Sequence, residues 1–253
     1  MNRIAQGLVL VLLGAAALGS SAFSELYLNY VQGAFRPFLI AAGAVLVLLG
    51  ALVVAADLRT AARGEEEEEG HDCQGHGDDH HGGPRVAWLL VLPAVAVFVV
   101  APPALGAYTA AASGAAEAPD PSRVDLSEYR DDPFAEAGDG PVELQLQEFV
   151  SRAWTDEERT MSGRTVELTG FVVPHPEGED EGWYLARLQM ACCAADAVVN
   201  RVLITDEPAP ETDSWWTVRG TWDEPEGDLQ SVRDHRFTVE EMREVENPPD
   251  PYE

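Results

Sequence analysis

Three uncharged apolar stretches constrain the fold of this chain more than any other feature. They cover residues 4–23, 38–56 and 86–105. Each approaches the roughly 20 residues that a helix needs to cross the hydrocarbon core of a bilayer. None carries the apolar stripe of an amphipathic helix. The sequence therefore predicts three transmembrane helices in a multi-pass protein of the cell membrane.

The first and third stretches each have an alternative interpretation. Arg3 precedes the first stretch and small residues end it, a pattern typical of a cleaved signal peptide, but two later stretches favour an uncleaved anchor. Pro93, Pro102 and Pro103 interrupt the third stretch. Membrane helices tolerate proline better than soluble helices do, so we still expect it to span.

Arginine positions predict the orientation of the spans. Lysine and arginine near span ends are retained in the cytoplasm. Three arginines lie between the second and third stretches and one precedes the first, whereas Arg36 alone lies between the first and second. We expect the N-terminus to be cytoplasmic and the part after about residue 108 to be extracytoplasmic. If the third stretch does not span, that part is cytoplasmic instead.

Changes in composition divide the chain into five expected parts. These are a transmembrane hairpin at 1–57, a His/Asp/Glu-rich loop at 58–85, a third transmembrane helix at 86–108, a flexible acidic linker at 109–140 and a soluble domain at 141–253. Glycines at positions 7, 14, 19, 43 and 50 leave small-residue surfaces where another helix could approach closely.

The polar loop contains four of the six histidines of the chain. The candidate metal ligands in it are His71, Cys73, His76, His80 and His81. Imidazole and thiolate suit Zn²⁺, Ni²⁺ or Cu²⁺, and the glycines would let the segment wrap around an ion. A solvated linker that binds metal only incidentally has the same composition, so both interpretations stay open.

The sequence of the soluble domain predicts a mainly β fold. A helical pattern at 146–153 is followed by strand patterns at 165–174, 183–191, 198–205, 215–222 and 236–239. About five short strands with one or two helices in so short a domain fit a small OB-like barrel, with a β-sandwich as the alternative. The predicted fold class is thus a membrane α-helical N-terminal part plus a mainly β C-terminal domain.

The charge of the chain argues against nucleic acid as a partner. The formal net charge is −28, and residues 117–253 hold 34 acidic and 11 basic side chains. Phosphate binding needs cationic surfaces, so a domain this acidic would repel a polyanion. An oligonucleotide-binding role for the OB-like domain is therefore disfavoured.

Adjacent thiols at Cys192 and Cys193 are the clearest candidate site. Neighbouring Cα atoms are about 3.8 Å apart, too close for an unstrained disulfide. Asp196 follows at helical spacing, and backbone N–H groups at the start of such a turn would favour thiolate. Zinc in proteins usually has about four ligands, and we expect His175, or as second choice His235, to supply the fourth. The alternative is a small core cysteine with Asp196 as a helix cap.

Catalytic motifs give no support for an enzyme. The cysteines lack the Cys-x-x-Cys spacing of disulfide exchange. The sequence has no Gly-rich phosphate loop, nucleophile elbow or His-Glu-x-x-His motif.

The string Cys-Cys-Ala-Ala-Asp-Ala at 192–197 resembles the signature of the YcgQ-like bacterial family of permease subunits. The N-terminal hairpin, the His/Asp-rich loop, residues 163–172 and the C-terminal Pro-Pro-Asp-Pro-Tyr at 248–252 also resemble that family. The resemblance implies an accessory partner of a separate multi-span permease in a two-component membrane complex.

The expected function combines the resemblance with the candidate ligands. We expect a membrane-anchored accessory subunit whose extracytoplasmic domain binds zinc or another divalent metal. The alternative is a purely structural or gating subunit with no ligand of its own.

Overall fold

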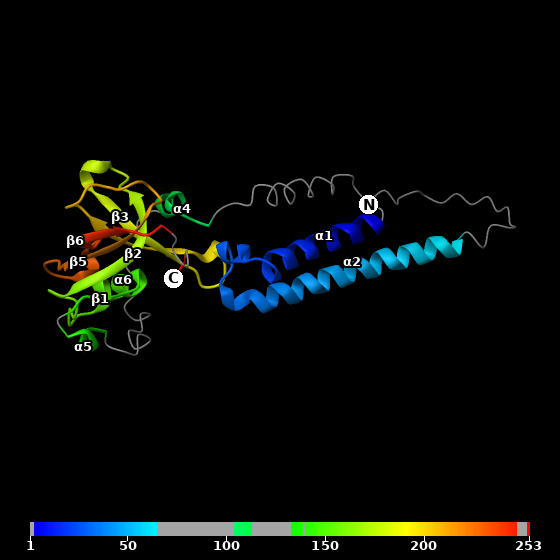
Figure 1. Ribbon diagram of the computed structural model, residues 1–253, viewed down its shortest axis with the longest axis horizontal. Coiled ribbons are helices and arrows are strands. Elements are labelled where there is room, and N and C mark those ends of the chain that lie inside the picture. Colours follow the sequence, from blue (N-terminus) through cyan, green and yellow to red (C-terminus); the bar gives the residue numbers. More distant parts are fainter. Residues whose placement is uncertain (1–2, 65–103, 113–132, 139, 247–251) are drawn as a thin grey trace. The chain divides into compact units, whose positions relative to one another are not determined.

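The computed structural model describes residues 3–64, 104–112, 133–138, 140–246 and 252–253. The chain divides into two compact units, Met1–Pro103 and Ala104–Glu253, and each is described by itself (Figure 1). Most of the predicted third span and of the acidic linker lies outside the described residues, as does the His-rich loop from residue 65 on, with His71, Cys73, His76, His80 and His81. Residues 58–64, which the composition predicted as the start of that loop, are helical.

The first unit is a helical hairpin. Helices α1 (Arg3–Ala22) and α2 (Arg36–Gly64) are joined through two short 3-10 turns, η1 (Leu26–Asn29) and η2 (Gly33–Phe35). Both long helices are apolar and long enough to cross a membrane. The two predicted N-terminal apolar helices are confirmed, and they suggest association with a membrane.

Glycines bring α1 and α2 into close contact. A Cβ atom on Gly14 would lie 2.7 Å from the carbonyl oxygen of Gly43, and one on Gly50 would lie 2.6 Å from that of Gly7. These separations are shorter than a carbon and an oxygen tolerate, so any larger residue would push the helices apart. The small-residue surfaces expected from the sequence thus face each other within the hairpin.

The second unit is built on a mixed six-stranded sheet. Its strands are β1 (Val142–Glu143), β2 (Thr165–Pro174), β3 (Trp183–Gln189), β4 (Val198–Ile204), β5 (Trp215–Asp223) and β6 (Arg236–Glu244). Its helices are α4 (Ala107–Ala112), α5 (Pro133–Ala137), α6 (Leu146–Thr155) and the 3-10 turns η5 (Glu179–Glu181), η6 (Ala194–Asp196) and η7 (Leu229–Ser231).

Strand β2 pairs with two of the long strands and with the short strand β1. It pairs antiparallel with β3 and with β5, and β1 lies parallel to it. Strand β4 pairs antiparallel with β3 and parallel with β6, and β5 pairs antiparallel with β6. The pairings therefore run from β2 through β3, β4, β6 and β5 back to β2.

The side chains of β3 alternate between two cores, as the period of a strand requires. Leu185 lies in the core that includes the apolar side chains of α6. Tyr184 and Ala186 lie in a second core, with two alanines of α4 and the ring of Tyr252. Both faces of the sheet are therefore covered at β3, which makes this strand a rigid base for the loop that follows it.

Two segments before residue 141 pack on the domain. Ala107 and Ala110 of α4 are buried one helical turn apart, and Phe134 of α5 is buried in the core with α6. The Asp213 carboxylate accepts a hydrogen bond from the Ala107 N–H and so caps α4. The compact unit thus includes Ala107, from the end of the predicted third span, and described parts of what the composition predicted as a linker.

Candidate metal centre

The cysteine pair lies in the loop between β3 and β4. These strands pair as far as Gln189 and Val198, so the residues between them form the connection of a hairpin. Met190 is buried, whereas Ala191 and Cys192 are exposed. The strand pairing therefore presents the thiols at one end of the sheet.

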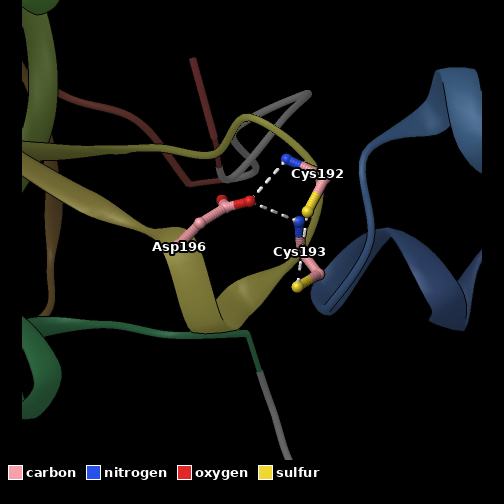
Figure 2. A group of neighbouring side chains, drawn as sticks. All are labelled: Cys192, Cys193 and Asp196. Carbon is pink, nitrogen blue, oxygen red and sulfur yellow. Dashed lines mark hydrogen bonds between the residues drawn. The ribbon is translucent and has the colours of Figure 1, made fainter.

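Three candidate ligands lie together in this loop (Figure 2). The sulfur atoms of Cys192 and Cys193 are 3.7 Å apart and not joined by a disulfide, with Cys192 exposed and Cys193 half-buried. One ligand atom from each cysteine and one from Asp196 all lie within 4.8 Å of one another. In the described part of the chain this is the one such group, and it could hold a metal ion.

The Asp196 carboxylate shapes the loop through backbone hydrogen bonds. It accepts the N–H of Ala191 at 3.0 Å, that of Cys192 at 2.8 Å and that of Cys193 at 3.2 Å. The Cys192 thiol, and then these N–H groups, hold the pKa of the Asp196 carboxyl below its usual value. Asp196 is therefore ionised at neutral pH and folds the chain around itself.

The sequence predicts that backbone N–H groups stabilise the thiolate form of the cysteines, and the structure does not agree with this prediction. Asp196 occupies those N–H groups. The interaction of the thiol with Asp196, followed by that with Cys193, raises the pKa of Cys192 to about 12. Cys192 is therefore a protonated thiol at neutral pH and a poor nucleophile until a cation replaces its proton.

His175 lies away from this cluster. It follows Pro174, which pairs with Trp183 at the start of β3, whereas the cysteines follow the end of that strand. Strand β3 is about 20 Å long at 3.3 Å per residue. The His175 ring stacks on Tyr184 with centroids 5.2 Å apart, and its Nδ1 accepts the Glu177 N–H at 3.3 Å. The structure does not bring it to the cysteines.

His235, the second-choice ligand, is buried between tryptophans. It is 3% exposed, and its ring lies 5.5 Å from that of Trp154 and 5.8 Å from that of Trp222. Its Nδ1 accepts the Trp222 indole N–H at 3.3 Å, and its Nε2 has no hydrogen-bond partner among the described residues. Burial lowers the pKa of His235 to about 4, so the ring is neutral. It is outside the cysteine cluster.

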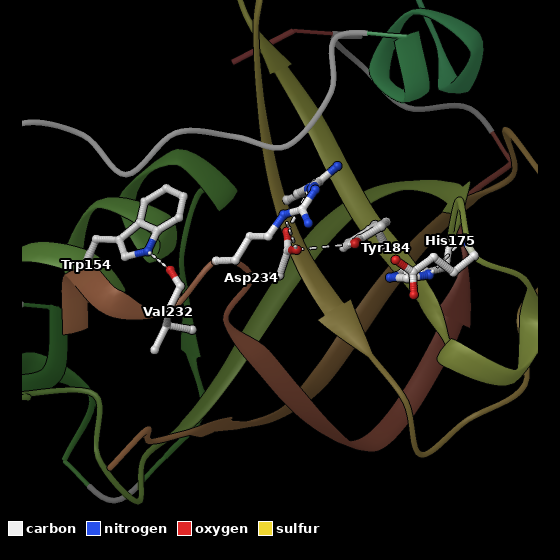
Figure 3. Close-up of polar contacts among 8 residues, drawn as sticks. Trp154, His175, Tyr184, Val232 and Asp234 are labelled. Atoms are coloured by element: carbon white, nitrogen blue, oxygen red, sulfur yellow. Dashed lines mark hydrogen bonds and ion pairs between the residues drawn. The ribbon is translucent and has the colours of Figure 1, made fainter. Parts of the chain in front are cut away.

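A buried polar network that the sequence did not reveal joins β3, β4 and the segment before β6 (Figure 3). Arg201 donates from Nε and Nη2 to Asp234 Oδ1 at 3.0 and 2.8 Å, and its guanidinium lies 4.1 Å from the Tyr184 ring centroid. The Tyr184 hydroxyl donates to Asp234 Oδ2 at 3.4 Å. Burial, and then Asp234, raise the pKa of Tyr184. These groups satisfy one another, so the network is structural.

Nothing in the sequence could have identified this network. Arg201 and Asp234 are 33 positions apart and belong to no local motif. Only the parallel pairing of β4 with β6 brings them together.

Comparison with known proteins supports an assignment for the C-terminal domain. No curated protein and no solved structure matches the chain. A family model does match, over a range that contains almost all of the sheet, the cysteine loop and Tyr252. Residues 143–253 match the DUF1980 C-terminal domain, so this domain fits a DUF1980-type family.

Proposed function

We propose that this chain is the membrane-anchored accessory subunit of a two-component permease, and that its C-terminal domain binds a divalent metal, with zinc as the first candidate. The observation that carries the proposal is the convergence of Cys192, Cys193 and Asp196 in one loop. Two sulfur ligands and one carboxylate oxygen form a donor set that zinc uses in proteins.

The sulfur separation fits a tetrahedral ion. Zinc–sulfur bonds of about 2.3 Å at tetrahedral angles place two ligand sulfurs about 3.8 Å apart. The Sγ atoms of Cys192 and Cys193 are 3.7 Å apart without any ion. An Asp196 oxygen at about 2.1 Å from zinc would lie about 3.6 Å from each sulfur, so the cluster, whose ligand atoms lie within 4.8 Å of one another, has to contract when the ion binds.

Three donors leave one coordination position open. Structural zinc sites are closed by four protein ligands, whereas sites with three protein ligands keep a position for water or another group. Cys192 is exposed, so this position is accessible. An ion held in this way can exchange with a ligand from another protein, which suits a subunit that presents metal to a permease.

The membrane part supports an accessory role. The structure describes two helices of spanning length, and the sequence predicts a third. Three spans are too few to enclose a solute path, which favours a separate multi-span partner. With a third span, the arginine distribution supports an extracytoplasmic C-terminal domain. Nothing in the loop supplies an activated nucleophile, so we do not assign an enzymatic activity.

We also assign the sheet to an OB-like barrel in preference to a β-sandwich. The support is that β2 pairs with both β3 and β5, so that the strand pairings return to their starting point. The cysteine loop then lies at one end of the barrel.

The test is metal binding by the full-length protein in detergent. The His-rich loop is first silenced, so that it cannot contribute, by Cys73→Ser and by alanine at His71, His76, His80 and His81. In this background we expect stoichiometric zinc after dialysis, and thiolate-to-cobalt absorption when Co²⁺ is the probe. Both signals should disappear in Cys192→Ser/Cys193→Ser.

Thiol labelling separates metal binding from a subunit that has no ligand. In the silenced background, zinc should protect Cys192 and Cys193 from alkylation, and a chelator should restore the reaction. Unchanged labelling with and without zinc, together with unchanged metal content in the double variant, would exclude the metal site and leave a structural or gating subunit.

A further inference from the structure

Tyr252 and Glu253 lie beside the end of β3, which is three positions before Cys192. Tyr252 forms a parallel bridge with Leu188. The Glu253 N–H donates to the Leu188 carbonyl at 2.9 Å, and the Met190 N–H donates to the main-chain oxygen of Glu253 at 3.4 Å. The pair therefore continues the hydrogen bonding of β3 up to Met190, beyond the last residue that pairs with β4.

The Glu253 side chain ties this segment to α6. Its carboxylate accepts the N–H of Leu146 at 2.7 Å and that of Gln147 at 2.8 Å, in the first turn of the helix. The residue before the helix, Gln145, provides no side-chain cap. Glu253 therefore supplies the cap of α6 from more than a hundred positions away, and a carboxylate suits the positive end of a helix.

The Arg187 guanidinium lies near the buried Glu253 carboxylate and helps to hold it in place. The Glu253 side chain is 3% exposed, and Arg187 Nε lies 4.0 Å from its Oε1. Burial raises the pKa of Glu253, while the helix N–H groups and Arg187 oppose that shift. Arg187 also donates to the Tyr252 main-chain oxygen at 3.1 Å. One arginine of β3 thus contacts both residues of the segment.

Tyr252 adds a second anchor. Its ring is buried in the core that also contains Leu188 and Met190. Its hydroxyl accepts the Leu105 N–H at 3.0 Å. The strand that leads into the cysteine loop is thereby attached to α6 through Glu253 and to the segment before α4 through Tyr252.

We propose that Glu253 and Tyr252 are positioning residues for the metal site, because they fix Met190 and hence the direction in which the chain enters the cysteine loop. This inference rests on the proposed function. Past Gln189 the loop is held by Asp196 within it and by Glu253 at its base. A loop released from its base has to be ordered again when the ion binds, and residues that orient ligands typically change metal affinity by about 10- to 100-fold.

Cobalt titration of the full-length protein in the silenced background tests the inference. The readouts are the dissociation constant from the thiolate-to-cobalt band and the thermal unfolding midpoint from tryptophan fluorescence. We expect Glu253→Ala to weaken Co²⁺ binding by about 10-fold or more. Glu253→Gln keeps the side-chain length and one acceptor oxygen, so it should restore part of the affinity.

A matched control separates positioning from general destabilisation. Asp228 caps η7 through the Gln230 N–H at 3.0 Å and has no contact with the cysteine loop. Asp228→Ala should lower the unfolding midpoint and leave cobalt affinity unchanged. Wild-type affinity in Glu253→Ala, or an equal loss in Asp228→Ala, would overturn the positioning role alone. Absence of the cobalt band from the wild-type background would instead overturn the metal site, and the inference with it.

Discussion

Asp196 accepts the backbone N–H of Cys192 at 2.8 Å, and the same carboxylate is the main cause of the raised pKa of the Cys192 thiol. One side chain thus folds the loop and keeps the sulfur of Cys192 protonated. A metal ion that binds here has to displace that proton.

Replacing Asp196 by asparagine tests this dual role. One acceptor oxygen becomes an NH₂ group that faces backbone N–H donors, so the loop loses its shape and the ion loses an anionic ligand. We expect Co²⁺ affinity to fall by about 10-fold or more. The measurement is cobalt titration in the silenced background.

Asp206→Asn is the matched control for this substitution. Asp206 also accepts a backbone N–H, from Val239 at 2.7 Å, but it lies outside the cysteine loop. Its replacement should leave cobalt affinity unchanged. If both variants bind like wild type, Asp196 is neither a ligand nor the organiser of the loop.

His235 should make the C-terminal domain less stable in mild acid. Its pKa is 6.5 when exposed, and burial lowers it to about 4 in the folded chain. Between these pH values the unfolded chain binds a proton that the folded chain does not. The free energy of unfolding should therefore fall as pH falls from about 6.5 to 4, by on the order of 3 kcal/mol. Urea unfolding followed by tryptophan fluorescence at pH 7, 6, 5 and 4 measures this change.

His235→Phe provides the control. The Trp222 indole N–H loses its acceptor, so the variant should be less stable at pH 7 by about 1–3 kcal/mol. The fall in stability between pH 6.5 and 4 should be smaller than in the wild type, because the titrating group is gone. The same pH dependence in both proteins would assign it to other groups.

Arg201→Met should strongly destabilise the domain. It removes the 2.8 Å ion pair with the mostly buried Asp234 carboxylate and leaves only the exposed Arg233 at 4.0 Å, and breaking a buried pair typically costs about 3–5 kcal/mol. Arg219→Met removes more exposed ion pairs, with Glu167 and Glu241, and should cost less than about 1 kcal/mol. Urea unfolding of both variants measures these losses in the free energy of unfolding. Equal losses would contradict a special role for the ion pair of Arg201 with Asp234.

Hydrophobic patterns located most of the elements. The alternation at 165–174 corresponds to β2, and the uniformly apolar runs at 4–23 and 38–56 correspond to α1 and α2. Strand β1 has two residues, too few for a pattern. Helix α4 falls across the predicted third span and linker, yet Ala107 and Ala110 are buried in a core with side chains of the sheet. Its role follows from tertiary packing alone.

The candidate site was only partly predictable for a related reason. Cys192, Cys193 and Asp196 are close in sequence, so one turn brings them together. His175 is also near in sequence, but an intervening strand carries it to the opposite end of β3. Glu253 is remote in sequence, and its contact with α6 depends on the whole domain fold. Only the structure shows that Asp196, and not the thiols, accepts the backbone N–H groups of the loop.

The 3.7 Å spacing of the two sulfur atoms also allows the native chain to be labelled selectively at this loop. Trivalent arsenic bonds to two neighbouring thiols at once, whereas an isolated cysteine such as Cys73 offers only one. A fluorescent arsenical dye should therefore mark this loop without any introduced tag. Displacement of the dye would report occupancy of the loop in living cells.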